Sequence, residues 1–174
     1  MTFKGLIFDK DGTLFHFQES WGDWMYQIID ELTNGKTGEK NLMADSLGFN
    51  LKEKEFLKNS VFIAGAAGEF VSCIEPYSQN LKGDDLMEFI TNKSINLVQK
   101  PVTNLPLLFR YLKSKNILLG IATNDCEKPA LSQLEAAKIL TYFDFVAGSD
   151  SGYGAKPKAG QLLKFLSEFN LVPN

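Results

Sequence analysis

The sequence contains little cysteine, little histidine and no long apolar segment. Its 174 residues include two cysteines, Cys73 and Cys126, whose spacing is not typical of a metal site or a redox motif. One disulfide between them remains open, but two cysteines do not make the framework that stabilises small secreted domains. No stretch approaches the roughly 18 apolar residues of a membrane-spanning helix. The N-terminus also lacks the charged and apolar regions of a signal peptide, so we expect a soluble, cytoplasmic protein without a membrane partner.

Concentrated positive charge is absent as well. The chain has 18 Lys and Arg against 21 Asp and Glu, which gives a formal net charge of −3. The densest group of lysines, Lys52–Lys58, is interleaved with Glu53 and Glu55 and predicts a solvated helix face. Without a basic patch, we expect no nucleic-acid partner.

Three short apolar runs predict strands that are buried on both faces: Gly5–Phe8, Ile117–Ala122 and Phe143–Ala147. Helical patterns follow the later runs or lie between them, at Leu105–Lys115, Pro129–Leu140 and Pro157–Asn170. Thr103 or Asn104 is expected to cap the first of these helices. Alternating strands and helices predict an α/β fold with a parallel sheet and right-handed crossovers.

Residues 16–100 differ from the rest of the chain because glycines separate a series of helical patterns. These patterns cover Trp21–Leu32, Leu42–Leu47, Lys52–Leu57, Gly68–Ile74 and Asp84–Val98, and Val61–Ala64 is a candidate short strand. We expect a helical domain at 16–100, inserted between 1–15 and 101–174 of the core, with Trp21, Trp24 and Tyr26 in its interior. An insert at this point of the chain can close over a site at the end of the first strand.

Two carboxylates follow the first predicted strand. Asp9 comes directly after the apolar run, at the carboxyl end where parallel sheets bind ligands, and Asp11 lies two residues further on. While the chain stays extended, the two side chains point the same way. Their repulsion is relieved by a cation between them, for which hard oxygen ligands favour Mg²⁺. Such a pair suits phosphoryl transfer, in which one carboxylate attacks phosphorus and the other protonates the leaving oxygen.

Other interpretations of this segment are a polar turn and a calcium loop. Gly12 allows a turn with a close backbone approach, and the Thr13 hydroxyl can orient a carboxylate. A calcium loop of the EF-hand type needs Gly at its sixth position and Glu at its twelfth, where this chain has Leu14 and Ser20. The calcium loop is therefore excluded.

The segment FDKDGTL, residues 8–14, resembles the first motif of the haloacid dehalogenase-like hydrolase superfamily. The second motif, an apolar strand that ends in Thr or Ser, is similar to ILLGIATN with Thr123. The third, a lysine before a helix, is similar to GYGAKP with Lys156. The order of these motifs and the helical insert resemble the phosphoglycolate-phosphatase-like branch, and the likeness covers essentially the whole chain.

The resemblance implies a Rossmann-like three-layer α/β core with an inserted helical cap of the C1 type. It also implies a Mg²⁺-dependent phosphatase that hydrolyses a small, phosphoglycolate-like phosphomonoester through an aspartyl-phosphate. Asp9 would be the nucleophile and a metal ligand, and Asp11 the acid/base, with its backbone carbonyl as a second metal ligand. The other implied roles are phosphate binding and charge neutralisation by Gly12, Thr13, Thr123, Asn124 and Lys156. On their own, Thr123 would be interpreted as a helix cap or turn residue, Lys156 as a solvated lysine and His16 as a hinge or pocket-rim residue.

The sequence departs from this family pattern at its fourth motif, an apolar strand followed by acidic residues. The chain reaches Leu171–Asn174 without such a segment, which predicts missing C-terminal strands and an unpaired, apolar edge on the first strand. Three explanations remain open: a fragment of a longer phosphatase, a catalytically silent binding module, or a sheet completed by self-association through that edge. A receiver-like phosphoacceptor domain is disfavoured, because such domains lack a large insert after the first strand.

Overall fold

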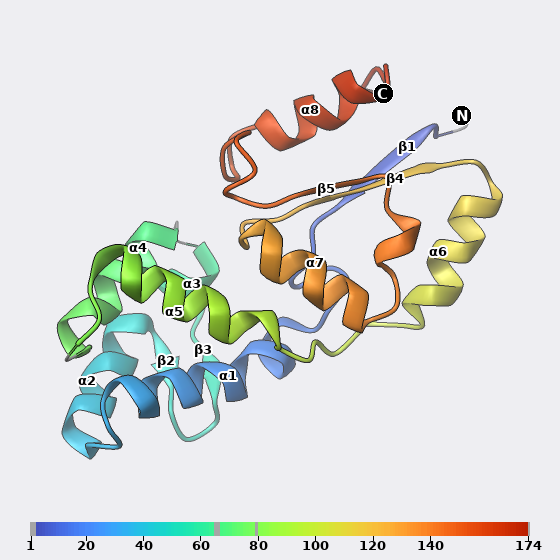
Figure 1. Cartoon of the computed structure of the whole chain (residues 1–174). Coiled ribbons are helices and arrows are strands. Elements are labelled where there is room, and N and C mark those ends of the chain that lie inside the picture. The colour runs from blue at the N-terminus through green and yellow to red at the C-terminus, as the bar shows by residue number, and fades with distance from the viewer. Residues whose placement is uncertain (1–2, 65–66, 79, 174) are drawn as a thin grey trace. The chain divides into compact units, whose positions relative to one another are not determined.

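The computed structural model describes residues 3–64, 67–78 and 80–173, which form two compact units. We call residues 3–16 with 98–173 the core unit, and Phe17–Leu97 the inserted unit. Figure 1 shows the elements of both along the chain. In the described residues, no helix is both long enough and apolar enough to cross a membrane.

The core unit is built on a parallel sheet of three short strands. They are β1 (Gly5–Phe8), β4 (Leu118–Ala122) and β5 (Phe145–Ala147), in the order β1-β4-β5. The register places Gly5 opposite Leu118 and Gly120 opposite Phe145. The apolar runs therefore form a parallel sheet, which confirms the predicted α/β class, and all three carboxyl ends lie at one edge.

Helices cover both faces of this sheet. The helices α6 (Leu105–Ser114) and α7 (Glu127–Ala136) lie on one face and α8 (Gly160–Glu168) on the other (Figure 1). On the α6 and α7 side, alternate strand residues join one apolar cluster: Leu6, Phe8, Leu119 and Ile121. On the other side, a Cβ at Gly120 would lie 2.9 Å from the Phe165 ring, so the absent side chain lets α8 approach β4 closely. The result is a three-layer core whose strands are buried from both sides.

The helix boundaries of the core unit agree only in part with the predicted ones. The Asn104 side chain accepts a hydrogen bond from the Leu107 amide, which confirms it as the cap of α6. The next helix begins at Glu127 and ends before a separate 3₁₀ turn, η2 (Leu140–Tyr142), rather than continuing to Leu140. Its first amide is capped from a distant loop, because Asp150 Oδ1 accepts from the Glu127 amide at 2.7 Å.

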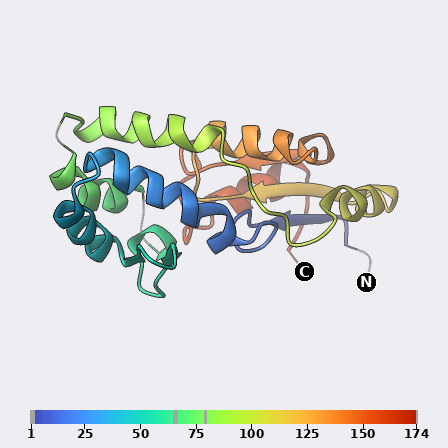
Figure 2. The same ribbon diagram turned by 90° about the horizontal axis from the view of Figure 1, so that it is seen from below.

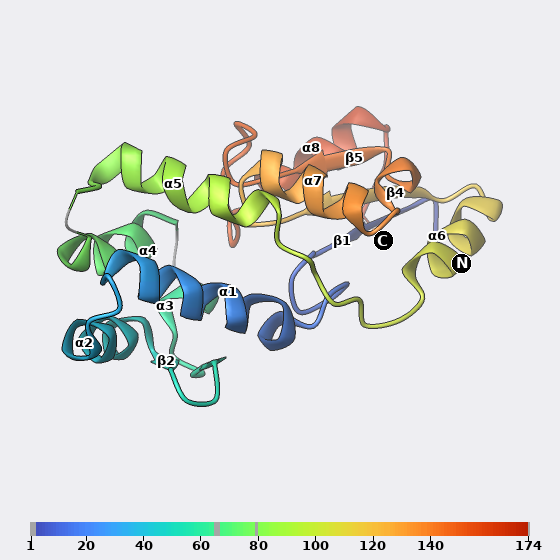
Figure 3. The same cartoon turned by 60° about the horizontal axis from the view of Figure 1, so that its bottom comes forward.

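The inserted unit is mainly helical. Its helices are α1 (Phe17–Leu32), α2 (Thr37–Leu47), α3 (Val61–Ala64), α4 (Ala67–Ile74), the 3₁₀ turn η1 (Glu75–Tyr77) and α5 (Gly83–Ile95). α1 and α5 run side by side (Figures 2 and 3), and Trp24 Nε1 donates to the Lys93 carbonyl at 3.2 Å. Trp21 and Trp24 are 2% and 7% exposed and Tyr26 is partly buried, which confirms their place in the interior of this unit.

Two predicted elements of the inserted unit are wrong. The segment predicted as a helix at Lys52–Leu57 belongs to a hairpin of β2 (Phe49–Asn50) and β3 (Glu55–Phe56). Its turn is made by Asn50, whose Oδ1 accepts from two following amides, at residues 52 and 53. The Phe49 and Phe56 rings pack across the strands with centroids 5.0 Å apart. Val61–Ala64, the candidate strand, is the short helix α3.

Candidate active site

The site begins at Asp9, the first residue after β1. Its Oδ1 accepts a hydrogen bond from the Lys10 amide at 2.7 Å and lies 2.5 Å from Lys156 Nζ. The Asp9 side chain is 45% exposed, so its carboxylate lies within reach of a ligand in solution. Thus the fold brings together two predicted site residues that are 147 positions apart in the chain.

The chain turns immediately after Asp11. Gly12 has a φ of 77°, in the left-handed region, and its amide donates to the Phe15 carbonyl at 2.9 Å. A side chain would be strained in this conformation, so the turn uses the freedom of glycine as the sequence predicts. Thr13 lies exposed on the same turn, and its role toward the carboxylates stays a prediction.

Thr123 and Asn124 follow β4 at the same edge of the sheet. Thr123 is 2% exposed, and its hydroxyl accepts from the Asp125 amide at 3.2 Å rather than capping α7. The Asn124 side chain holds the backbone of Lys156 from both sides. Its Oδ1 accepts from the Lys156 amide at 2.8 Å, and its Nδ2 donates to the Lys156 carbonyl at 3.1 Å. Asn124 therefore positions the loop that carries Lys156, while direct phosphate binding by its amide stays a prediction.

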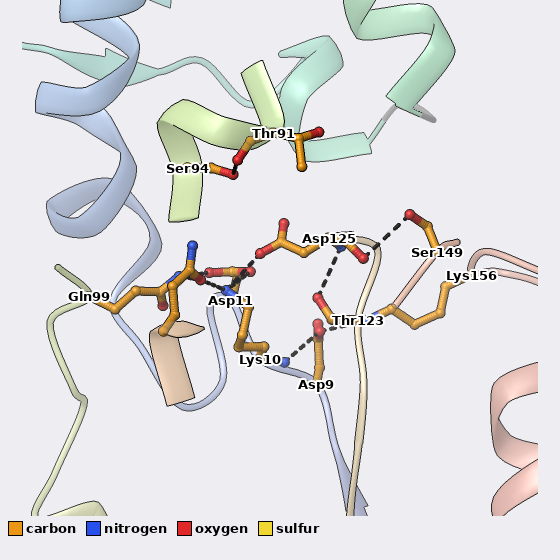
Figure 4. Close-up of polar contacts among 11 residues, drawn as sticks. Asp9, Lys10, Asp11, Thr91, Ser94, Gln99, Thr123, Asp125, Ser149 and Lys156 are labelled. Atoms are coloured by element: carbon orange, nitrogen blue, oxygen red, sulfur yellow. Dashed lines mark hydrogen bonds and ion pairs between the residues drawn. The ribbon is translucent and has the colours of Figure 1, made fainter. Parts of the chain in front are cut away.

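Lys10 was not singled out from the sequence, although it is central to the site. Its side chain is fully buried, and Nζ lies 2.6 Å from Gln133 Oε1 and 2.8 Å from both Asp11 Oδ2 and Asp125 Oδ2 (Figure 4). The sequence did contain a signal for Lys10. Alternate residues of a strand point to the same face, and Lys10 continues the series of Leu6 and Phe8, which join the apolar cluster on the α6 and α7 side. A lysine directed to that face needs oxygen partners, and the sequence does not show where they come from.

Asp125 was likewise interpreted only as part of a cap. Its side chain is 20% exposed, and burial raises the pKa of Asp125 to about 6, against the opposing attraction of Lys10. Asp11 is held through both oxygens, since Gln99 Nε2 donates to Oδ1 at 2.9 Å and Lys10 lies beside Oδ2. Gln99 and Gln133 had no local sequence signal, because glutamine is ordinary in a linker and on a helix.

The donor set of the site is compatible with a magnesium ion. No group of three or more His, Cys, Asp or Glu side chains within the described ranges is arranged to hold a metal. Mg²⁺ is commonly held by one or two carboxylates, with water and substrate phosphate completing its shell. The Asp9 carboxylate and the Asp11 backbone carbonyl are hard oxygen ligands on one short loop, so the residues present fit the ion.

The arrangement can perform nucleophilic and acid/base chemistry at one point. An exposed carboxylate at a sheet edge lies beside a lysine that offsets the charge of an attacking anion. A second carboxylate two residues away is held by two donors.

Comparison with known proteins identifies a matching family. The family model described as haloacid dehalogenase-like hydrolase matches residues 6–174. A search of curated proteins finds no match.

Solved structures show the same fold. A predicted phosphoglycolate phosphatase from Haemophilus somnus is 18% identical, with a TM-score of 0.66 over 98% of this chain and 73% of that one. The L-2-haloacid dehalogenase from Xanthobacter autotrophicus is 15% identical, with a TM-score of 0.57 over 99% of this chain and 67% of that one.

Proposed function

This chain belongs to the haloacid dehalogenase-like hydrolase family, and from that premise we propose that it is a Mg²⁺-dependent phosphatase of small phosphomonoesters. The observation that carries the proposal is the constellation at the end of β1. There, Asp9 is paired with Lys156 at 2.5 Å, and the second carboxylate, Asp11, follows two residues later. The phosphoglycolate phosphatase among the similar structures makes phosphoglycolate the first substrate to test.

In the first step, an Asp9 oxygen attacks phosphorus and the bond from phosphorus to the ester oxygen breaks. Asp11 donates its proton to that oxygen, which leaves as an alcohol. The product on the enzyme is an aspartyl-phosphate. Lys156 offsets negative charge on Asp9 and on the phosphoryl oxygens during the transfer.

In the second step, water attacks the phosphorus of the aspartyl-phosphate. Asp11 accepts a proton from this water, inorganic phosphate leaves, and the Asp9 carboxylate is regenerated. Thr123 and the backbone amides after β4 would bind the phosphoryl oxygens, on a loop that Asn124 fixes to Lys156. Mg²⁺ held by Asp9 and Asp11 would supply further neutralisation of the phosphoryl charge.

The presence of Asp11 favours a phosphatase over a dehalogenase, although dehalogenases are among the similar structures. An alkoxide leaves poorly without a proton, whereas a halide leaves as a stable anion and needs none. A carboxylate held by two donors beside the nucleophile is therefore a feature that phosphomonoester hydrolysis uses.

The test is release of inorganic phosphate by this chain with Mg²⁺ from a panel of phosphomonoesters that includes phosphoglycolate. We expect turnover that Asp9→Asn abolishes, that chelation of Mg²⁺ lowers, and that Asp144→Asn preserves. Asp144 is a fitting control because it binds Lys113 and the Leu119 amide at the opposite end of β4.

The second candidate is a catalytically silent binding module of the same family. A silent module would agree with the described residues, among which no group of three or more His, Cys, Asp or Glu side chains is arranged to hold a metal. If the folded chain released no phosphate from any ester in the panel, the phosphatase proposal would be overturned in favour of this one.

A further inference from the structure

The Asp11 carboxylate is held from two sides. Gln99 Nε2 donates to Oδ1 at 2.9 Å, and Lys10 Nζ lies 2.8 Å from Oδ2 (Figure 4). The side chain is 15% exposed, so it is largely shielded from solvent. An aspartate gripped through both oxygens loses the freedom to rotate that an aspartate in an open loop would have.

The two donors are themselves anchored to one point of α7. Gln133 Oε1 accepts from Lys10 Nζ at 2.6 Å and from Gln99 Nε2 at 2.7 Å. Gln133 is 1% exposed and Gln99 8%, while Lys10 is fully buried, so all three lie in the packed interior of the core unit. Because two acceptors face Gln99 Nε2, the orientation of that amide is determined by its surroundings.

We propose that Lys10 and Gln99 are positioning residues that hold Asp11 where it exchanges a proton with the leaving oxygen, with Gln133 as their common anchor. The inference rests on the proposed phosphatase function and adds to it the residues that support the acid/base. Neither side chain is assigned a contact with the substrate, and each acts through Asp11. A site that holds its acid/base with buried, well-packed donors keeps the distance required for proton transfer.

The competing interpretation is a polar cluster that serves stability alone. The two interpretations differ in their dependence on the leaving group. p-Nitrophenolate leaves without a proton, whereas the alkoxide of an alkyl phosphate depends on the proton from Asp11. Loss of positioning should therefore slow formation of the aspartyl-phosphate selectively for alkyl phosphates, while a general structural defect should slow this step for both substrates alike.

The experiment measures kcat and KM for phosphoglycolate and for p-nitrophenyl phosphate, with Mg²⁺, in the wild type, Gln99→Met and Lys10→Met. We expect Gln99→Met to lower kcat/KM on phosphoglycolate about tenfold or more, and kcat/KM on p-nitrophenyl phosphate less than about threefold. The ratio kcat/KM reports formation of the aspartyl-phosphate and excludes its hydrolysis, in which Asp11 serves both substrates alike. Lys113→Met is the matched control, since it removes a lysine ion pair with Asp144 at the far end of the sheet. An equal fall of kcat/KM on both substrates would overturn the proposal.

Lys10→Met leaves two carboxylates without their buried cation and can prevent folding, so Gln99→Met, which removes an uncharged donor, decides the test. Crystal structures of the wild type and of Gln99→Met give a second readout that needs no turnover. We expect one rotamer of Asp11 in the wild type and more than one in Gln99→Met. If the wild type lacks phosphatase activity, the proposed function is wrong, but the positioning role can still be tested from the crystal structures. An unchanged Asp11 rotamer in the variant would then overturn the positioning role.

Discussion

Lys10 places a buried positive charge between carboxylates that come from different parts of the core unit. Asp11 and Asp125 each lie 2.8 Å from its Nζ, and Lys156 pairs with Asp9 nearby. Removing charges from water is costly, and the attraction between them offsets that cost only when every partner is well placed. Such a cluster is therefore better explained by a need to hold the groups of the proposed site than by a gain in stability.

At the residue scale, the titration of Asp125 makes stability depend on pH. Burial raises the pKa of Asp125 from an ordinary 3.8 to about 6, so the folded state binds this proton more tightly than the unfolded chain. The stabilisation is fully present below the ordinary value and is lost as the pH rises through about 6. We expect the free energy of unfolding of the wild type, relative to Asp125→Asn, to fall on the order of 2 kcal/mol across this interval.

Urea unfolding of both proteins from about pH 4 to about pH 7, without added Mg²⁺, measures this difference. Above the raised pKa, the difference should become constant. A difference that rose with pH would show that the attraction of Lys10 outweighs burial at Asp125, and a flat difference would show that the two effects cancel. Either result would contradict the prediction.

At the element scale, the hairpin of the inserted unit lies against a glycine of α1. A Cβ at Gly22 would lie 2.1 Å from the Lys54 carbonyl oxygen, a backbone atom that cannot move aside easily. Glycine in the middle of a helix normally costs stability relative to alanine, so its presence here has a packing reason. The close approach lets the turn of the hairpin cover α1.

We expect Gly22→Ala to lower the free energy of unfolding by about 1–3 kcal/mol, because the hairpin must shift. The matched control is Gly38→Ala in α2, where a Cβ would meet nothing within 4 Å and where alanine should raise stability by up to about 1 kcal/mol. Thermal or urea unfolding of the two variants measures the contrast. Stabilisation by both substitutions would mean that the hairpin does not pack on α1.

The same hairpin shows why one element escaped prediction. Lys52–Leu57 consists of four Lys and Glu residues followed by Phe56 and Leu57, and Lys, Glu and Leu favour helices. The strands of the hairpin have only two residues each and leave little pattern in the sequence. What selects the hairpin is the packing of Phe49 on Phe56 and two hydrogen bonds between Gln18 and the Phe56 backbone, 38 residues away. Gln18 Nε2 donates to the Phe56 carbonyl, and Gln18 Oε1 accepts from the Phe56 amide. Such contacts appear only once α1 is in place.

At the scale of the whole molecule, β1 is an edge strand of the described sheet, with β4 as its one strand neighbour there. The Leu118 amide donates to the Lys4 carbonyl at 2.9 Å. Because a parallel ladder uses every second residue, the backbone groups of Gly5 and Ile7 face the open edge. An open edge beside the exposed ring of Phe3 is a surface on which a second copy can pair.

We therefore expect concentration-dependent association in sedimentation velocity experiments. Phe3→Lys should raise the dissociation constant roughly tenfold, which corresponds to about 1.4 kcal/mol of association free energy. Leu107→Lys is the matched control, because Leu107 is 61% exposed against 57% for Phe3 and lies on α6. A monomer at every concentration would contradict this prediction, as would an equal effect of both lysine variants.

The sequence by itself determined the parallel α/β core and the order of its motifs. Short apolar runs predict strands buried on both faces, and a carboxylate or threonine directly after such a run lies at the ligand-binding edge. These are local rules, and Asp9, Asp11 and Thr123 follow them. For the same reason, the turn at Gly12 and the Asn104 cap could be predicted.

Only the tertiary structure decided how these residues are supported. Lys10 and Gln133 are 123 positions apart, and Gln99 and Asp11 are 88 apart, so no local pattern relates them. Whether Asn124 binds the Lys156 loop depends on the packing of a segment 32 residues away. Local periodicity determines which face a side chain occupies, whereas the partners on that face are known only after the helices pack against the sheet.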